Sequence, residues 1–160
     1  MSVTVALDLG TTTGYAIGWQ LSEIESGCVD FSPKRTDSDG MRFLRFRCWL
    51  HDLKRRANVL GEDFDLILFE RVDFVRSGQV YAAHVWGGFW AILTAWAEHH
   101  GIECRGVAVS TLKKQICGNG RAKKPAIIAA VRALGYSPKD SNEADALALL
   151  LVHRRLARAA

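Results

Sequence analysis

The chain of 160 residues is the right length for a single folded domain. Hydrophobic residues make up 49% of it and charged residues 24%, which excludes an intrinsically disordered chain and allows a packed core. The net charge of +4 is compatible with a nucleic-acid partner but does not require one.

No stretch approaches the roughly 18 uninterrupted apolar residues of a membrane-spanning helix. The N-terminus also lacks the charged region, apolar stretch and cleavage site of a secretory signal. We therefore expect a cytoplasmic protein with no membrane partner. The cysteines contain no C-x-x-C pair, so we expect reduced thiols rather than a zinc site.

The first part of the chain has the pattern of consecutive strands. Residues 2–9 alternate between apolar and polar positions, and residues 13–20 form a matching hairpin partner across a Gly/Thr-rich turn. A third strand is expected at 26–32. From residue 41 to residue 57, apolar side chains recur at helical spacing, which predicts an amphipathic helix.

The second part alternates between strands and helices. We expect a buried strand at 64–70, a long aromatic helix at 78–100 and a strand at 102–109. Two helices follow, at 123–135 and 142–158. The resulting order, β-β-β-α-β-α-β-α-α, predicts an α/β fold with a mixed sheet and helices on its faces.

Small residues recur at intervals of four within the expected helix 78–100 and form one stripe: Ala83, Gly87, Ala91 and Ala95. Such a stripe allows another element to approach closely. Packing against the sheet of the same chain and packing against a second subunit both explain it.

Three carboxylates occupy comparable places in the pattern. Asp8 and Glu70 each end an apolar strand, and Asp145 lies near the start of the last helix. Ligand sites of α/β sheets gather at strand ends and helix N-termini, so these side chains could converge. Clustered carboxylates repel one another, and a hard divalent cation relieves the repulsion. The pattern therefore indicates a Mg²⁺ or Mn²⁺ site suited to phosphodiester hydrolysis.

Each carboxylate also has an ordinary structural interpretation. Asp8 could close an Asx turn, Glu70 could pair with a neighbouring arginine, and Asp145 could favour the start of its helix. It is the combination of the three that favours a metal site.

Four further stretches carry a recognisable pattern: ALDLGTTTGYAIG, LILFERVDF, VSTLKKQICGNGRAKKPAI and NEADALALLLVH. Through these stretches the sequence resembles the RuvC-type Holliday junction resolvases of the RNase H-like nuclease superfamily. It implies an RNase H-like fold with a mixed five-stranded sheet and helices on both faces. It further implies a homodimer, a Mg²⁺ cofactor for which Mn²⁺ may substitute, and symmetric nicking of four-way DNA junctions. The short chain suggests a phage or prophage version.

The resemblance also assigns the site. Asp8, Glu70 and Asp145 match three acidic metal ligands of the family. A fourth family position, one turn before the last ligand, is acidic or histidine, whereas this chain has Asn142 there. Helical spacing makes Asn142 the best partner for Asp145. The missing charge could come from Glu143, which we include among the expected ligands, or from Asp140.

Basic residues are expected to contact DNA. Lys113 and Lys124 match positions that the family keeps near the scissile phosphate, and Lys124 is also a candidate catalytic residue. The neighbouring residues Lys114, Arg121 and Lys123 extend a phosphate-binding track.

The segment directly after Glu70 is expected to approach the centre of the junction. Phe74 is a candidate for stacking on an unpaired base, between Arg71 and Arg76. A core position for Phe74 is the alternative.

Three other functions compete with a DNA resolvase. A junction-binding protein with a weakened active site is suggested by Asn142, and a related nuclease acting on RNA would use the same carboxylates. An actin-like nucleotide-binding protein is suggested by DLGTTTGYAIG, but that group needs two such lobes to enclose ATP.

Overall fold

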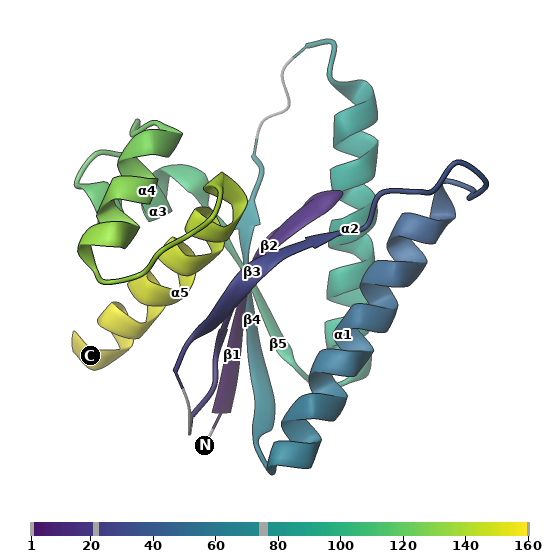
Figure 1. Cartoon of the computed structure of the whole chain (residues 1–160), viewed down its shortest axis with the longest axis horizontal. Coiled ribbons are helices and arrows are strands. Elements are labelled where there is room, and N and C mark those ends of the chain that lie inside the picture. The colour runs from purple at the N-terminus through teal and green to yellow at the C-terminus, as the bar shows by residue number, and fades with distance from the viewer. Residues whose placement is uncertain (1, 21–22, 74–76, 160) are drawn as a thin grey trace.

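The computed structural model describes residues 2–20, 23–73 and 77–159. Within these residues, five strands form one sheet and five helices cover its two faces (Figure 1). The elements in chain order are β1 (Ser2–Asp8), β2 (Thr12–Gly18), β3 (Glu25–Asp30), α1 (Gly40–Leu60), β4 (Asp63–Arg71), α2 (Val80–His99), β5 (Glu103–Ala108), α3 (Val109–Cys117), α4 (Lys124–Ala133) and α5 (Ser141–Ala159).

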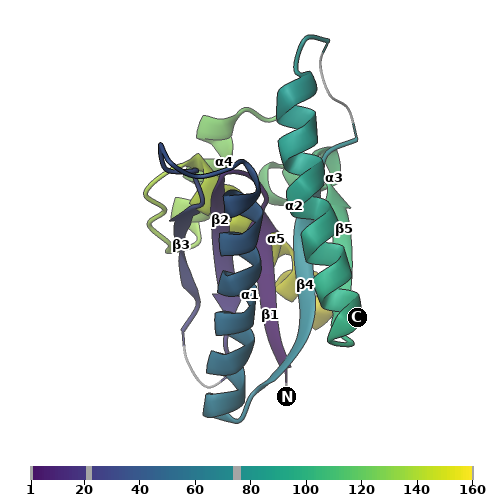
Figure 2. The ribbon, with the colours of Figure 1, turned by 90° about the vertical axis from the view of Figure 1, so that its right-hand side faces the viewer.

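The sheet has the strand order β3-β2-β1-β4-β5. β1, β2 and β3 pair in antiparallel fashion, whereas β4 lies parallel to both β1 and β5. Helices α1 and α2 cover one face and α3, α4 and α5 cover the other, so the sheet lies between two helical layers (Figure 2). The predicted mixed five-stranded sheet with helices on both faces is confirmed.

The alternation of side chains along the strands divides the core into two parts. Val3, Val5 and Leu7 of β1 face α1 and α2, where aromatic rings such as Phe46 and Phe89 pack edge to face. The intervening Ala6 faces α5. This alternation places every second residue of β1, including Asp8, on the α5 side.

Helix α3 was not predicted from the sequence. It starts at Val109 immediately after β5 and ends at Cys117. The next residue, Gly118, caps the helix in the left-handed conformation with a φ of +73°. The expected strand at 102–109 and helix at 123–135 are confirmed, but the segment between them is helical over Val109–Cys117.

Small residues on β2 allow α5 to lie very close to the sheet. Gly14, Ala16 and Gly18 alternate along β2 and face α5. A Cβ atom on Gly14 would lie 2.0 Å from the carbonyl oxygen of Asn142 and 2.9 Å from the backbone nitrogen of Glu143. The first turn of α5 therefore rests directly on the backbone of β2.

A buried arginine joins the other helical layer to the turn after β1. Arg42 of α1 is 6% exposed; its Nη1 donates to Thr11 Oγ1 (3.2 Å) and its Nη2 donates to Tyr81 Oη (2.9 Å). The β1–β2 turn is closed by Thr13, whose hydroxyl donates to the carbonyl oxygen of Gly10 (2.7 Å).

We expect Gly14→Ala to destabilise the protein by about 3 kcal/mol, because the backbone of α5 would have to move away from β2. Gly40→Ala is the matched control, since the atom nearest to its added Cβ is Ser38 Oγ at 3.9 Å. The control should change stability by less than about 1 kcal/mol. Denaturant unfolding would compare the two variants, and equal stabilities would contradict the close packing of α5.

Candidate active site

Asp8 and Glu70 lie at the ends of neighbouring parallel strands. The register pairs Leu7 of β1 with Phe69 of β4. Asp8 directly follows Leu7, and Glu70 directly follows Phe69. Leu7 and Phe69 belong to the core on the α1 and α2 side. Because side chains alternate along a strand, Asp8 and Glu70 both face α5.

Asp145 reaches the same region from α5. The helix crosses β2 and β1, and its residues from Glu143 to Leu150 are all buried. Asp145 itself is 8% exposed. The contact of Asn142 with Gly14, which pairs with Asp8 across the hairpin, brings the start of α5 to the end of β1.

The electrostatics show that the three carboxylates influence one another. Burial raises the pKa of Asp8 well above its ordinary value, and the charges of Glu70 and Asp145 raise it further. Burial and the charge of Asp145 raise the pKa of Glu70 to about 7. Burial also raises the pKa of Asp145. All three shifts disfavour the charged form, so a cation at this place would relieve an existing strain.

Two lysines partly compensate this negative charge. Lys124, the first residue of α4, lowers the pKa of all three carboxyl groups. Lys113, which is half-buried on α3, lowers the pKa of Glu70 and Asp145. Lys124 Nζ also donates to Ser141 Oγ at 3.3 Å, which links the starts of α4 and α5. The two lysines predicted at the site are therefore beside the carboxylates.

The ordinary structural roles considered for the carboxylates are filled by other residues. Thr13 closes the turn after β1, where an Asx turn by Asp8 was the alternative. Arg71, the neighbour of Glu70, pairs with Asp73 (2.6 Å). At the start of α5, Asp140 accepts the backbone N–H of Glu143 (2.9 Å) and so caps the helix.

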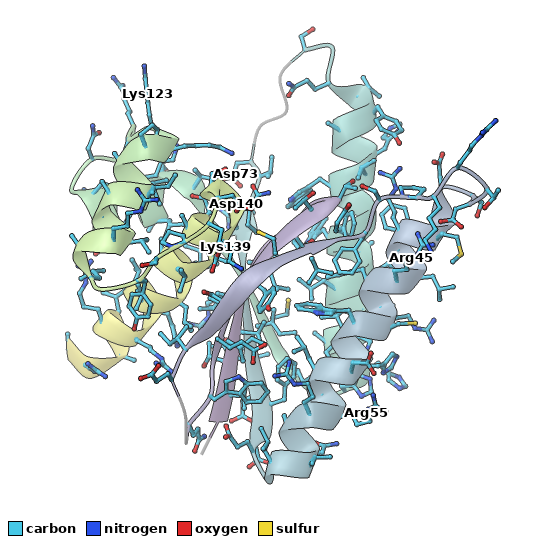
Figure 3. All side chains as sticks on the ribbon, in the orientation of Figure 1. Arg45, Arg55, Asp73, Lys123, Lys139 and Asp140 are labelled. Atoms are coloured by element: carbon cyan, nitrogen blue, oxygen red, sulfur yellow. The ribbon has the colours of Figure 1, made fainter. Side chains whose placement is uncertain are left out.

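The remaining candidates at the start of α5 differ in their contacts. Asn142 Nδ2 donates to the carbonyl oxygen of Thr12 (3.4 Å), beside Gly14. Glu143 is turned toward β3, and both of its carboxylate oxygens accept hydrogen bonds from the protein. Cap formation lowers the pKa of Asp140, which lies with Lys139 where α5 begins (Figure 3).

The described residues contain no ready-made metal cluster. Within 2–20, 23–73 and 77–159, no three histidine, cysteine, aspartate or glutamate side chains are gathered so that they could hold an ion. The carboxylates of Asp8, Glu70 and Asp145 still fit Mg²⁺ or Mn²⁺ chemically, because these ions prefer oxygen ligands. Burial and repulsion between carboxylates raise the pKa of Asp8 and of Glu70, and a cation would relieve that repulsion. Side-chain movement would be needed to bring Asp8, Glu70 and Asp145 onto one ion.

The other predicted DNA contacts differ in their exposure and in their partners. Lys114, Arg121 and Lys123 are exposed on α3 and on the connection to α4, and Lys123 points outward (Figure 3). Arg71 is exposed but paired with Asp73. Phe74 and Arg76 lie outside the described residues.

Sequence reasoning missed the residues that hold α5 in place. Gly14 looked like part of a turn, and Ser26 and Cys28 looked like ordinary positions of an edge strand. Ser26 and Cys28 contact residues more than a hundred positions away, at separations of 117 and 112. Only the spacing of small residues on β2 could have indicated a close helix.

Comparison of the sequence with protein-family models and with curated proteins gives no match. Solved structures do match. Thermus thermophilus RuvC is 22% identical, with a TM-score of 0.75 over 98% of this chain and 96% of that one. T. thermophilus RuvC in complex with a Holliday junction substrate is 21% identical, with a TM-score of 0.77 over 98% and 95%.

The yeast mitochondrial Holliday junction resolvase Ydc2 is also similar, at 13% identity and a TM-score of 0.60 over 97% of this chain and 80% of that one. These likenesses establish the fold: the chain has the α/β architecture of the RuvC resolvases, as the sequence predicted. Within the described residues, no helix is long and apolar enough to cross a membrane.

The raised pKa of Glu70 predicts how stability depends on pH when no cation is bound. The pKa is about 7 in the folded protein and 4.5 ordinarily, so the folded state binds more protons between these values. The contribution of Glu70 to the free energy of unfolding is therefore fully present below the ordinary pKa, and it is lost as the pH rises toward 7. The loss amounts to at most about 3 kcal/mol.

Glu70→Gln should flatten the pH dependence of stability in this range, because the glutamine amide does not titrate. Denaturant unfolding in EDTA from about pH 4 to about pH 8 would measure it. Glu98→Gln, at an exposed position of α2, is the control and should follow the wild type. A Glu70→Gln profile that falls as steeply as the wild-type profile would contradict the assignment.

Proposed function

We propose that this protein is a metal-dependent, structure-selective DNA endonuclease that resolves four-way junctions by symmetric nicking. The observation that carries the proposal is that Asp8, Glu70 and Asp145 face one region at the ends of β1 and β4, with raised pKa values and two lysines beside them. The fold shared with T. thermophilus RuvC, which has been solved with a Holliday junction substrate, supports it.

In this proposal the carboxylates hold Mg²⁺ or Mn²⁺. Asp8, Glu70 and Asp145 supply the charge, and the amide oxygen of Asn142 is the nearest neutral donor one turn before Asp145. The bound ion would polarise the phosphodiester and make the attacking water more acidic. Glu70, with a pKa of about 7, must lose its proton before it can ligate, so cation binding should release protons near neutral pH.

The basic residues would place the DNA backbone. Lys113 and Lys124 lie beside the carboxylates and would neutralise the phosphate at which charge develops. Lys114, Arg121 and Lys123 are exposed on the adjoining surface and would follow the strand through phosphate contacts. Selectivity would then come from the branched shape of the DNA rather than from the bases.

Cleavage of a labelled four-way junction tests the proposal. We expect paired nicks with Mg²⁺ or Mn²⁺, none with EDTA, and none in a matched linear duplex. Asp8→Asn or Asp145→Asn should lower the rate by at least about a hundredfold, because each removes a charged ligand. Asp65→Asn makes the same change at an exposed position of β4 and should nick as the wild type does.

The same assay decides between this proposal and its two rivals. Junction binding without nicking in either metal would indicate a binding protein whose site is weakened by Asn142. Cleavage of a single-stranded RNA run in parallel, with the DNA junction left intact, would move the activity to RNA. Nicking of the junction that survives Asp8→Asn would refute the proposed mechanism.

A homodimer is part of the proposal, because paired nicks need two sites. The sheet side of α2 carries Phe89 and Leu93, and Gly88 makes the close approach to Phe43 of α1. The stripe of small residues lies elsewhere: Ala91 and Ala95 are exposed. Packing within the chain therefore does not account for this half of the stripe, whereas Ala83 and Gly87 are half-buried.

Exposed aromatic surface lies on the same helix. Trp90 is 46% exposed and stacks on Trp86 with ring centroids 5.7 Å apart, and Tyr81 is 64% exposed. A large apolar surface beside small residues is typical of a helix that packs against a second subunit.

We expect Ala91→Glu to convert the dimer to a monomer, because it places a charge in the closely packed stripe. Sedimentation equilibrium would measure the mass, and circular dichroism would show that the fold is retained. Ala129→Glu, at an exposed position of α4, is the control and should remain dimeric. A wild-type protein that sediments as a monomer would contradict the proposed dimer.

A further inference from the structure

Two side chains of β3 hold the first turn of α5. Ser26 Oγ donates to Glu143 Oε1 at 2.7 Å, and Cys28 Sγ lies 3.2 Å from both carboxylate oxygens of Asp140. Ser26 and Cys28 are two residues apart on one strand, so they face the same side of the sheet. The start of α5 is therefore tied to β3 at two points.

Glu143 is the more deeply buried of the two acidic residues. It is 5% exposed, and its second oxygen, Oε2, accepts the backbone N–H of Lys139 at 2.8 Å. The backbone N–H of Glu143 in turn donates to Asp140. The arrangement resembles a capping box in which the carboxylate accepts from Lys139, the residue before the cap, rather than from Asp140 itself, and Ser26 adds a third bond to β3.

Helical geometry turns Glu143 away from the helix face that carries Asn142 and Asp145. Asn142 and Asp145 are three positions apart and share a face, whereas Glu143 is turned about 100° from Asn142. Asn142 contacts Thr12 and Gly14, near the end of β1. Glu143 contacts β3 instead. Fixing Glu143 against β3 thus fixes the rotation of the helix that presents Asn142 and Asp145.

We infer that Glu143 is a positioning residue, not a metal ligand: through Ser26 and the backbone of Lys139 it holds Asn142 and Asp145 toward Asp8 and Glu70. The inference rests on the proposed function. It replaces the sequence-based expectation that Glu143 supplies a ligand charge, because both of its carboxylate oxygens are already engaged by protein donors.

The test uses substitutions on both sides of one hydrogen bond. Ser26→Ala removes the donating hydroxyl, Glu143→Gln removes the charge and replaces one of the two accepting oxygens with a donor, and the double variant makes both changes. Ser26→Thr keeps the hydroxyl, and Glu98→Gln repeats the amide substitution at an exposed place. Calorimetric titration with Mn²⁺ in the absence of DNA gives the first readout, junction binding in EDTA the second, and the nicking rate the third.

For a positioning role we expect Ser26→Ala to weaken Mn²⁺ binding and lower the maximal nicking rate by about tenfold to a hundredfold. Glu143→Gln should do the same, and the double variant should be no worse than the worse single variant. Ser26→Thr and Glu98→Gln should match the wild type. Junction affinity in EDTA should be unchanged in every variant, because no DNA contact is altered.

A direct ligand role for Glu143 gives a different result. Ser26→Ala would then bind Mn²⁺ as the wild type does, while Glu143→Gln alone would lose affinity, and the inference would be overturned. Unchanged Mn²⁺ affinity and rate in both single variants would overturn it as well.

Failure of the proposed function is recognised in the wild type. A wild-type chain that neither binds Mn²⁺ nor nicks junctions refutes the nuclease proposal, and the positioning role toward a cation falls with it. Hydrogen exchange at the first-turn amides of α5 reports on the contact with β3 independently: exchange that is not faster in Ser26→Ala than in the wild type would show that Ser26 does not hold the helix.

Discussion

The arrangement of the candidate site depends on the direct contact between the backbone of α5 and the backbone of β2 at Gly14. No side chain separates the two elements there, and a Cβ atom would overlap the carbonyl group of Asn142. Ala16 continues the small-residue face of β2 toward α5, and at Gly18 the guanidinium group of Arg154 fills the space beside the strand. The contact at Gly14, the partner of Asp8 across the hairpin, brings the start of α5 to the end of β1.

The close approach gathers negative charge in a poorly solvated place. Burial raises the pKa of Asp8, Glu70 and Asp145, and repulsion from neighbouring carboxylates raises the pKa of Asp8 and Glu70 further. Lys113 and Lys124 offset only part of this repulsion. Such an arrangement is unfavourable for the isolated protein, and the cation of the proposed function would offset the cost.

Much of the fold follows from local sequence patterns. The alternation in β1, the Gly/Thr turn and the apolar run ending at Glu70 predict strands that the structure contains, with boundaries that differ by a few residues. The positions of Asp8 and Glu70 at strand ends were sufficient to predict that they face the same region. Parallel pairing of β1 with β4 makes these two residues neighbours.

The parts that could not be predicted depend on tertiary contacts or on missing local signals. α3 follows β5 without a connecting turn and without a side-chain cap, so the valine-rich strand pattern runs into it unmarked. Arg42 lies in the expected amphipathic helix at a position with no apolar side chain, yet it is buried and donates to Thr11 and Tyr81. The bond from Ser26 to Glu143 spans 117 residues, and no local pattern contains it.

The way α5 is held has a consequence for how this site can change over evolution. The helix is seated by its own backbone on Gly14 and by the carboxylates of Asp140 and Glu143. The side chain at position 142 contributes only one long hydrogen bond, to Thr12. Exchange of an acidic residue for asparagine there alters the charge of the site while leaving the scaffold that presents Asp145 intact. If the proposed cation site is correct, position 142 is thus a place where one substitution would change the charge offered to the cation without rebuilding the fold around it.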